Sequence, residues 1–124
     1  MYRIITDKAP RAIGPYSQGT SAARFVFVSG QLPVDPDTNE IEAGDISCQT
    51  RRCIANVQAV LSELDLTLDD VTKTTVFLTD MDEFEGMNSV YAEHFMKPGP
   101  ARSCVQVAAL PRKVKVMIEA IACR

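Results

Sequence analysis

An arginine and a glutamate near the C-terminus are the residues of this sequence best suited to chemistry. Arg102 stands in the stretch PGPARSCVQV (98–107), at the start of an expected strand. Glu119 lies in the last expected strand, on the face that also carries Met117 and Ile121. Strand alternation gives Glu119 apolar neighbours on its own face, so its carboxylate is partly desolvated and needs a cation or a hydrogen-bond donor. Arg102 is the candidate partner.

Two interpretations of this pair remain open from the residues alone. In the first, Arg102 and Glu119 form a structural salt bridge, because ion pairs are commoner in proteins than active sites. In the second, the planar guanidinium of Arg102 holds the carboxylate of a substrate through two parallel hydrogen bonds. Glu119 then acts as an acid or a base on water or on the substrate.

Cys104, two residues after Arg102, invites comparison with a catalytic nucleophile. A nucleophilic cysteine needs a nearby base, and the only histidine, His94, falls on the apolar stripe of an expected helix. Small apolar packing is therefore the favoured role for the Cys104 side chain.

Three further positions carry polar groups that could line a cleft. Tyr16 lies in the glycine-flanked stretch IGPYSQG, where its hydroxyl could reach a ligand. Ser29 and Gly30 end an expected strand, where backbone groups become free to bind. Asn88 falls within an expected helix, where most asparagines are solvated.

The elements that must position these residues follow from periodicity and from turn residues. Apolar positions three and four apart predict a helix over 45–64, capped by Asp45, and a second helix from Asp80 to the break at Lys97–Pro100. Residues 8–23 are expected to be irregular. Strands are expected at 2–7, 24–31, 71–79, 101–108 and 113–122.

The order ββαβαββ is typical of an α+β fold with both helices on one face of a sheet. The simplest pairing makes a hairpin of the last two strands. In the last strand one face is entirely apolar and should meet the helices; it consists of Val114, Val116, Ile118, Ala120 and Ala122.

Composition narrows the function classes. The 124 residues suit one domain spanning 1–124, and 46% hydrophobic with 23% charged residues is an ordinary globular balance. A net charge of −3 argues against nucleic acid as the main partner. Four cysteines without a CxxC pair and one histidine predict no metal site. The N-terminus lacks an apolar signal core and no apolar run approaches a membrane span, so a cytoplasmic protein is expected.

Five stretches together resemble the RidA/YjgF family, the reactive intermediate deaminases, along essentially the whole chain. They are GPYSQG, VSGQLPVDP, KTTVFLTDMDEF, MNSVYAEHF and PARSCVQVAALPRKVKVMIEAIA, of which the last is the most specific. The resemblance implies a chorismate-mutase-like fold and a homotrimer in which three sheets face inward as a barrel, with a cleft at each subunit interface. It also implies that the final strand is inserted centrally, so Arg102 and Glu119 need not be neighbours.

The implied activity is hydrolysis of 2-imino acids and their enamine tautomers, such as 2-aminoacrylate, 2-iminopropanoate and 2-iminobutanoate, to 2-keto acids and ammonia. No cofactor is implied, and the substrates come from pyridoxal-phosphate-dependent serine and threonine dehydratases. Carried over by motif, Arg102 grips the substrate carboxylate and Glu119 positions or activates water. The backbones of Cys104, Ser29 and Gly30 bind substrate polar atoms, and Tyr16 and Asn88 line the cleft.

Two alternatives to a deaminase remain: a non-enzymatic sensor that binds 2-keto acids in the same cleft, and a ribonuclease-type translation inhibitor. The segment Lys97–Gly99 departs from the family pattern by being short and by presenting Gly99. The sequence therefore does not identify the pocket for the substrate side chain or the preferred imine.

Overall fold

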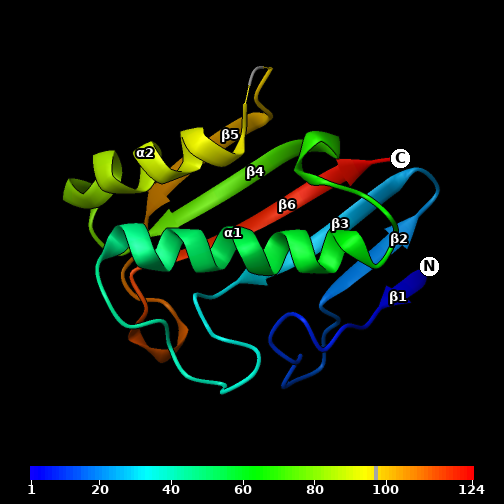
Figure 1. Ribbon diagram of the computed structural model, residues 1–124, viewed down its shortest axis with the longest axis horizontal. Coiled ribbons are helices and arrows are strands. Elements are labelled where there is room, and N and C mark those ends of the chain that lie inside the picture. Colours follow the sequence, from blue (N-terminus) through cyan, green and yellow to red (C-terminus); the bar gives the residue numbers. More distant parts are fainter. Residues whose placement is uncertain (97) are drawn as a thin grey trace.

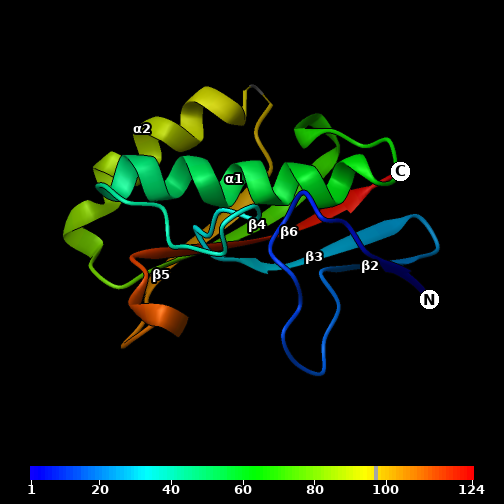
Figure 2. The same cartoon turned by 60° about the horizontal axis from the view of Figure 1, so that its bottom comes forward.

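The computed structural model describes residues 1–96 and 98–124, in which two helices cover one face of a six-stranded sheet (Figures 1 and 2). The strands are β1 (Tyr2–Ile4), β2 (Gly19–Ala22), β3 (Phe25–Gln31), β4 (Val71–Leu78), β5 (Ala101–Gln106) and β6 (Val116–Cys123). The helices are α1 (Ile46–Ser62) and α2 (Phe84–His94), and short 3₁₀ turns lie at Leu68–Asp70, Met81–Glu83 and Pro111–Lys113.

The sheet is mixed, with the strand order β1-β2-β3-β6-β4-β5. Strands β4 and β5 run parallel, because α2 forms the crossover between them, and all other neighbours are antiparallel. The C-terminal strand β6 lies between β3 and β4. The hairpin of the last two strands expected from the pattern alone is therefore wrong, and the central insertion implied by the family resemblance is confirmed.

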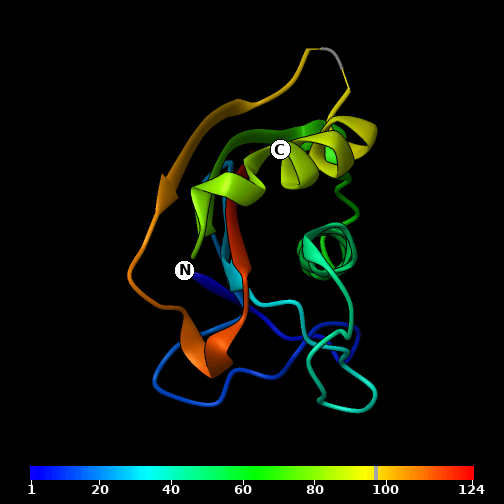
Figure 3. The ribbon, with the colours of Figure 1, turned by 90° about the vertical axis from the view of Figure 1, so that its left-hand side faces the viewer.

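Strand β6 carries the core because its residues alternate between two very different faces. The face toward the helices is buried and consists of Val116, Ile118, Ala120 and Ala122; Val114, two residues before the strand begins, is buried as well. This face meets a buried stripe of α1 formed by Cys53, Ile54, Val57, Val60 and Leu61. Burial of one such side chain contributes about 1.5–3 kcal/mol, so this contact holds α1 against the sheet. The other face is open on the side without helices (Figure 3).

The elements differ from the sequence prediction mainly at the N-terminus. The helix expected at 45–64 is confirmed, and Asp45 caps it by accepting a hydrogen bond from the Cys48 amide. The loop expected at 8–23 contains β2, a short strand whose residues GTSA carry little strand signal. Asp80 caps the 3₁₀ turn before α2 rather than α2 itself, which begins at Phe84. Lys97, part of the expected helix end, lies outside the described residues.

Helix α2 lies close against the first turn of α1 because Gly86 has no side chain. A Cβ atom added at Gly86 would lie 2.6 Å from Cγ2 of Ile46. That methyl group belongs to a β-branched side chain with a stiff χ1, so it cannot move aside cheaply. The contact fixes the height of α2 above the sheet, and α2 carries Asn88.

We expect Gly86→Ala to destabilise the protein although alanine is the better helix former. The gain in helix propensity is about 1 kcal/mol, whereas overpacking against Ile46 costs about 1–3 kcal/mol. Urea unfolding measures the difference, with Ser89→Ala on the exposed side of the same helix as the control. If Gly86→Ala stabilises the protein as much as the control does, the close approach of the two helices is wrong.

Candidate functional site

The residues predicted to bind substrate fall into two separate groups. The first group lines a cleft of about 560 Å³ on the open side of the sheet. It contains Tyr16, Ser29, Gly30 and Glu119, and we call these four residues the Glu119 half-site. Met117, on the same face of β6 as Glu119, forms part of the wall.

A β-bulge shapes this half-site. Two residues of β3, Ser29 and Gly30, oppose a single residue of β6, Glu119, where the register of the ladder shifts. Gly30 leaves room for Met117, because a Cβ atom at this position would lie 2.7 Å from its Sδ and the methionine side chain would have to shift. The bulge thus brings backbone polar groups beside a carboxylate, as bulges near active sites often do.

The polar groups of Ser29 are already engaged in the described structure. Its amide donates to the carbonyl of Gln18 over 3.0 Å, and its hydroxyl donates to the carbonyl of Ser17. Its carbonyl accepts from Nε2 of Gln31 over 3.0 Å. Ser29 therefore joins the bulge to the segment that carries Tyr16, and Gly30 is the better candidate for a backbone contact with a ligand.

The second group surrounds Arg102 on the helix side of the sheet. Nη1 of Arg102 donates to Oδ1 of Asn88 over 2.7 Å. The guanidinium carbon lies 4.6 Å from the ring centroid of Tyr91 and 5.5 Å from that of Phe84. We call Arg102, Asn88 and Cys104 the Arg102 half-site.

Aromatic rings of α2 thus support a charge that has no carboxylate partner. Among residues 1–96 and 98–124, no carboxylate forms an ion pair with Arg102. The Tyr91 ring is held in turn by a hydrogen bond of 2.7 Å between its hydroxyl and that of Thr74. Burial raises the pKa of Tyr91, opposed by this bond and by the charge of Arg102, so the phenol stays neutral. A guanidinium offers five N–H donors, so the arginine keeps donors for an anion.

The salt bridge between Arg102 and Glu119 is not formed within one chain. In the ladders Arg102 pairs with Thr74, whereas Glu119 pairs with Thr75. Consecutive residues of a strand point to opposite faces, so the two charged side chains lie on opposite sides of the sheet. Alternation within β5 puts Arg102, Cys104 and Gln106 on one face of that strand. Alternation within single strands does not say which face of β5 lies on the same side of the sheet as a given face of β6.

Cys104 lies on the helix side of the edge strand β5, half-buried beside Arg102. Burial raises the pKa of its thiol, and the nearby charge of Arg102 only partly opposes this. The thiol is therefore protonated at neutral pH, which agrees with packing rather than nucleophilic attack. Because β5 is at the edge of the sheet, one side of its backbone is open to a ligand.

Sequence reasoning did not single out Phe84 and Tyr91, which support Arg102 in the structure. Their spacing of seven residues in α2 puts them on one side of the helix, and this spacing was the available signal. Sequence reasoning also did not single out Gln18, which lines the cleft of the Glu119 half-site.

Two features are absent from the part of the chain that the structure describes, residues 1–96 and 98–124. No group of three or more histidine, cysteine, aspartate or glutamate side chains is placed to hold a metal ion there. None of its helices combines the length and the apolar character that crossing a bilayer requires.

Comparison with known proteins gives the family. Residues 6–124 match the family model described as Endoribonuclease L-PSP. A RutC family protein of Pyrococcus abyssi is 50% identical over 119 residues, covering 96% of this chain and 94% of the relative. The 2-iminobutanoate/2-iminopropanoate deaminase of Salmonella typhimurium is 47% identical over 124 residues, covering 98% of this chain and 96% of the relative.

Solved structures agree with this grouping. Escherichia coli TdcF with bound serine superposes with a TM-score of 0.93 at 47% identity, covering 100% of this chain and 99% of the other. RidA from an Antarctic Psychrobacter gives a TM-score of 0.96 at 40% identity and covers both chains fully. With its mixed sheet and two helices on one face, this chain belongs to the YjgF/RidA family, whose model carries the name Endoribonuclease L-PSP.

Proposed function

We propose that this protein hydrolyses 2-imino acids, with their enamine tautomers, to 2-keto acids and ammonia. The observation that carries the proposal is a guanidinium held by aromatic rings and an asparagine instead of a carboxylate. Such an arginine is prepared for a ligand anion and suits the carboxylate next to an imine carbon. The relative named 2-iminobutanoate/2-iminopropanoate deaminase supports the choice of reaction.

The chemistry needs orientation and a water molecule. The imine carbon is electrophilic, and more so when the nitrogen is protonated. Water adds to the carbon of the protonated imine while Glu119 accepts a proton from the water, which gives a carbinolamine. Glu119 then passes this proton to the carbinolamine nitrogen. The C–N bond breaks, ammonia leaves, and Glu119 accepts the hydroxyl proton as the C=O bond of the keto acid forms. Arg102 holds the carboxylate throughout, so both partners of the addition are presented in a fixed geometry.

The two half-sites must come from different copies of the chain if they act together. Within one chain the sheet separates Arg102 from Glu119. The open face of the sheet carries large apolar side chains that a second copy could cover, including Phe25, which is 49% exposed, and Phe27, which is 41% exposed. We therefore propose a homotrimer in which the Glu119 half-site of one subunit faces the Arg102 half-site of the next. Dehydratases that release imines from serine or threonine would supply the substrate.

Replacement of Arg102 tests the proposed anchor. A charge-assisted hydrogen bond is worth about 1.5–3 kcal/mol, so Arg102→Ala should lower kcat/KM for 2-iminobutanoate by about 10- to 100-fold. Arg102→Lys keeps the positive charge but cannot form two parallel hydrogen bonds to a carboxylate, so its activity should lie between those of Arg102→Ala and the wild type. Threonine dehydratase generates the imine, and semicarbazide traps the imine that has not been hydrolysed. The rate of hydrolysis is measured as the decrease in the amount of this semicarbazide adduct.

Arg51→Ala is the matched control, because Arg51 is an exposed arginine that pairs with Glu93 on the helix layer. It should leave kcat/KM unchanged. Full activity of Arg102→Ala would remove Arg102 from the site. A wild-type protein that binds 2-keto acids without accelerating hydrolysis would be a sensor, and RNA cleavage lost in Arg102→Ala would indicate a ribonuclease.

A mixing experiment tests whether the site is shared between subunits. Arg102→Ala alone is expected to keep about 1–10% of wild-type activity, and Glu119→Gln about 1% or less, because loss of a general base costs about 10²- to 10⁴-fold. When the two are unfolded and refolded together in equal amounts, chance pairing gives about a quarter of the sites two intact halves in a cyclic trimer. Activity should therefore rise to about a quarter of the wild-type value, whereas separately refolded variants mixed afterwards should at first keep the low activity of the single variants. No recovery in mixed trimers would mean that one chain supplies both residues.

Replacement of Cys104 separates its backbone from its thiol. Because the raised pKa keeps the thiol protonated, Cys104→Ala should retain kcat/KM within about threefold, the scale of a small packing change. The same assay measures this, and the pH profile between 6 and 9 should not change. A loss on the scale of Arg102→Ala would show that the sulfur takes part in the reaction.

A further inference from the structure

The wall of the Glu119 half-site that carries Tyr16 is a long segment without helix or strand. It runs over residues 5–18, between β1 and β2. Tyr16 itself is 49% exposed, and its local ties are a turn bond of 2.8 Å to the Gly14 carbonyl and a contact of 3.4 Å between the Ile13 amide and its hydroxyl. Something outside this turn must hold the wall in place, because irregular segments of this length are otherwise mobile.

The side-chain amide of Gln18 holds the wall in place through hydrogen bonds. Its Oε1 accepts from the Thr6 amide over 2.8 Å, and its Nε2 donates to the carbonyls of Thr6, Ala9 and Pro10 over 2.9, 3.1 and 2.8 Å. The residue is only 5% exposed. Buried bonds of this kind are costly to lose, because each carbonyl would be left without a partner.

The backbone of Gln18 extends the same connection to the bulge. Its carbonyl accepts from the amide of Ser29 over 3.0 Å, within the bulge that opposes Glu119. One residue therefore binds the start of the wall through its side chain and the bulge through its main chain. Although Gln18 borders the cleft, both ends of its amide are occupied by backbone groups of the wall, so the hydrogen bonds of its side chain act on the wall.

We propose that Gln18 is a positioning residue of the Glu119 half-site. It fixes the rest of the wall, residues 5–17, against the Ser29–Gly30 bulge. The inference rests on the proposed function. Only a carboxamide serves here, because the site needs an acceptor for one amide and donors for carbonyls. A carboxylate of the same shape can accept but cannot donate, and its charge would face three carbonyl oxygens.

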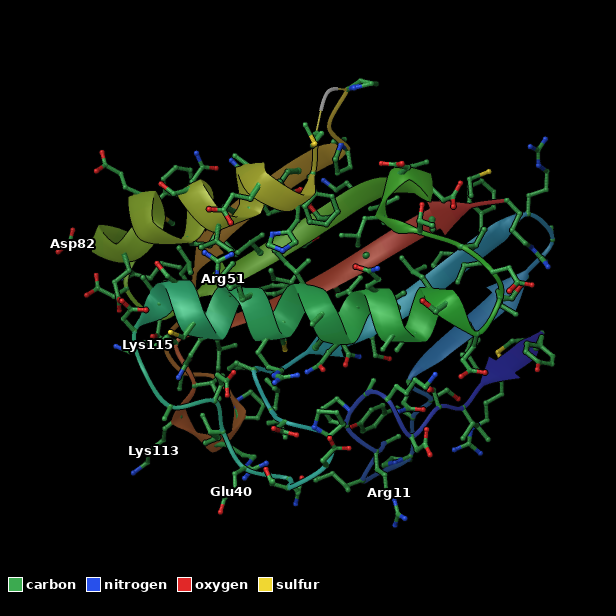
Figure 4. All side chains as sticks on the ribbon, in the orientation of Figure 1. Arg11, Glu40, Arg51, Asp82, Lys113 and Lys115 are labelled. Atoms are coloured by element: carbon green, nitrogen blue, oxygen red, sulfur yellow. The ribbon has the colours of Figure 1, made fainter. Side chains whose placement is uncertain are left out.

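Gln18→Glu and the apolar Gln18→Met test the proposal in the imine assay. We expect KM to rise about tenfold or more with a smaller change in kcat, because substrate binding must then order the wall. Trypsin reports the wall directly, since Lys8 and Arg11 lie in it and Arg11 projects from the lower edge of the molecule (Figure 4). Cleavage after Arg11 in the native protein should accelerate in both variants.

Gln49→Glu is the matched control. Gln49 is likewise buried, at 7% exposure, and its side chain bonds to the Glu42 carbonyl and the Lys115 amide, away from the cleft. This variant should lose stability without a rise in KM or faster cleavage at Arg11. Tyr16→Phe in the Gln18→Met background should cost less than in the wild type, because the hydroxyl is then already misplaced.

The proposal is overturned if folded Gln18 variants keep the wild-type KM and cleavage rate, or if they match Gln49→Glu in every measurement. It is also overturned if both Gln18 variants are unfolded under conditions where Gln49→Glu is folded, because Gln18 is then a structural residue only. A wild-type protein inactive on imines contradicts the proposed function instead, and the trypsin comparison still tests the role of Gln18 in the wall.

Discussion

The position of β6 in the middle of the sheet is the constraint on which the rest of the structure depends. One face of this strand is apolar without interruption and packs under α1, and the other carries Met117 and Glu119. A strand of this kind is most stable where both its edges are paired and its apolar face is covered, which is between β3 and β4. Once it lies there, Glu119 must emerge on the face without helices, opposite the bulge of β3.

The same arrangement sends Arg102 to the other side of the sheet. Strand β5 follows β4 in parallel through α2, so the register places Arg102 beside Thr74, under the helix. There Tyr91 and Phe84 support the guanidinium through their ring faces, an attraction that strengthens as water is removed, while Asn88 takes one of its donors. The charge is oriented without being neutralised, which is the condition for binding an anion rather than closing an internal salt bridge.

The two half-sites are built by different means. The Arg102 half-site is held by side chains on regular elements, whose geometry is set by packing. The Glu119 half-site combines a strand bulge with an irregular wall, and the carboxamide of Gln18 replaces the regular backbone hydrogen bonds that this wall lacks. In the proposed function, the Arg102 half-site would be the anchor for the substrate carboxylate, and the irregular wall would line the rest of the cleft.

The sequence by itself determined most of the helices and strands and the apolar face of β6, and it pointed to Arg102 and Glu119 as candidates for chemistry, because periodicity and residue chemistry are local properties. It indicated both helices and five strands, but missed β2, whose residues Gly19–Ala22 are neither β-branched in series nor alternating. Tertiary structure alone decided strand order, and with it the separation of Arg102 from Glu119. That decision depends on which face of one strand continues the face of another, and pairing between strands distant in the chain leaves no periodic signal in the sequence.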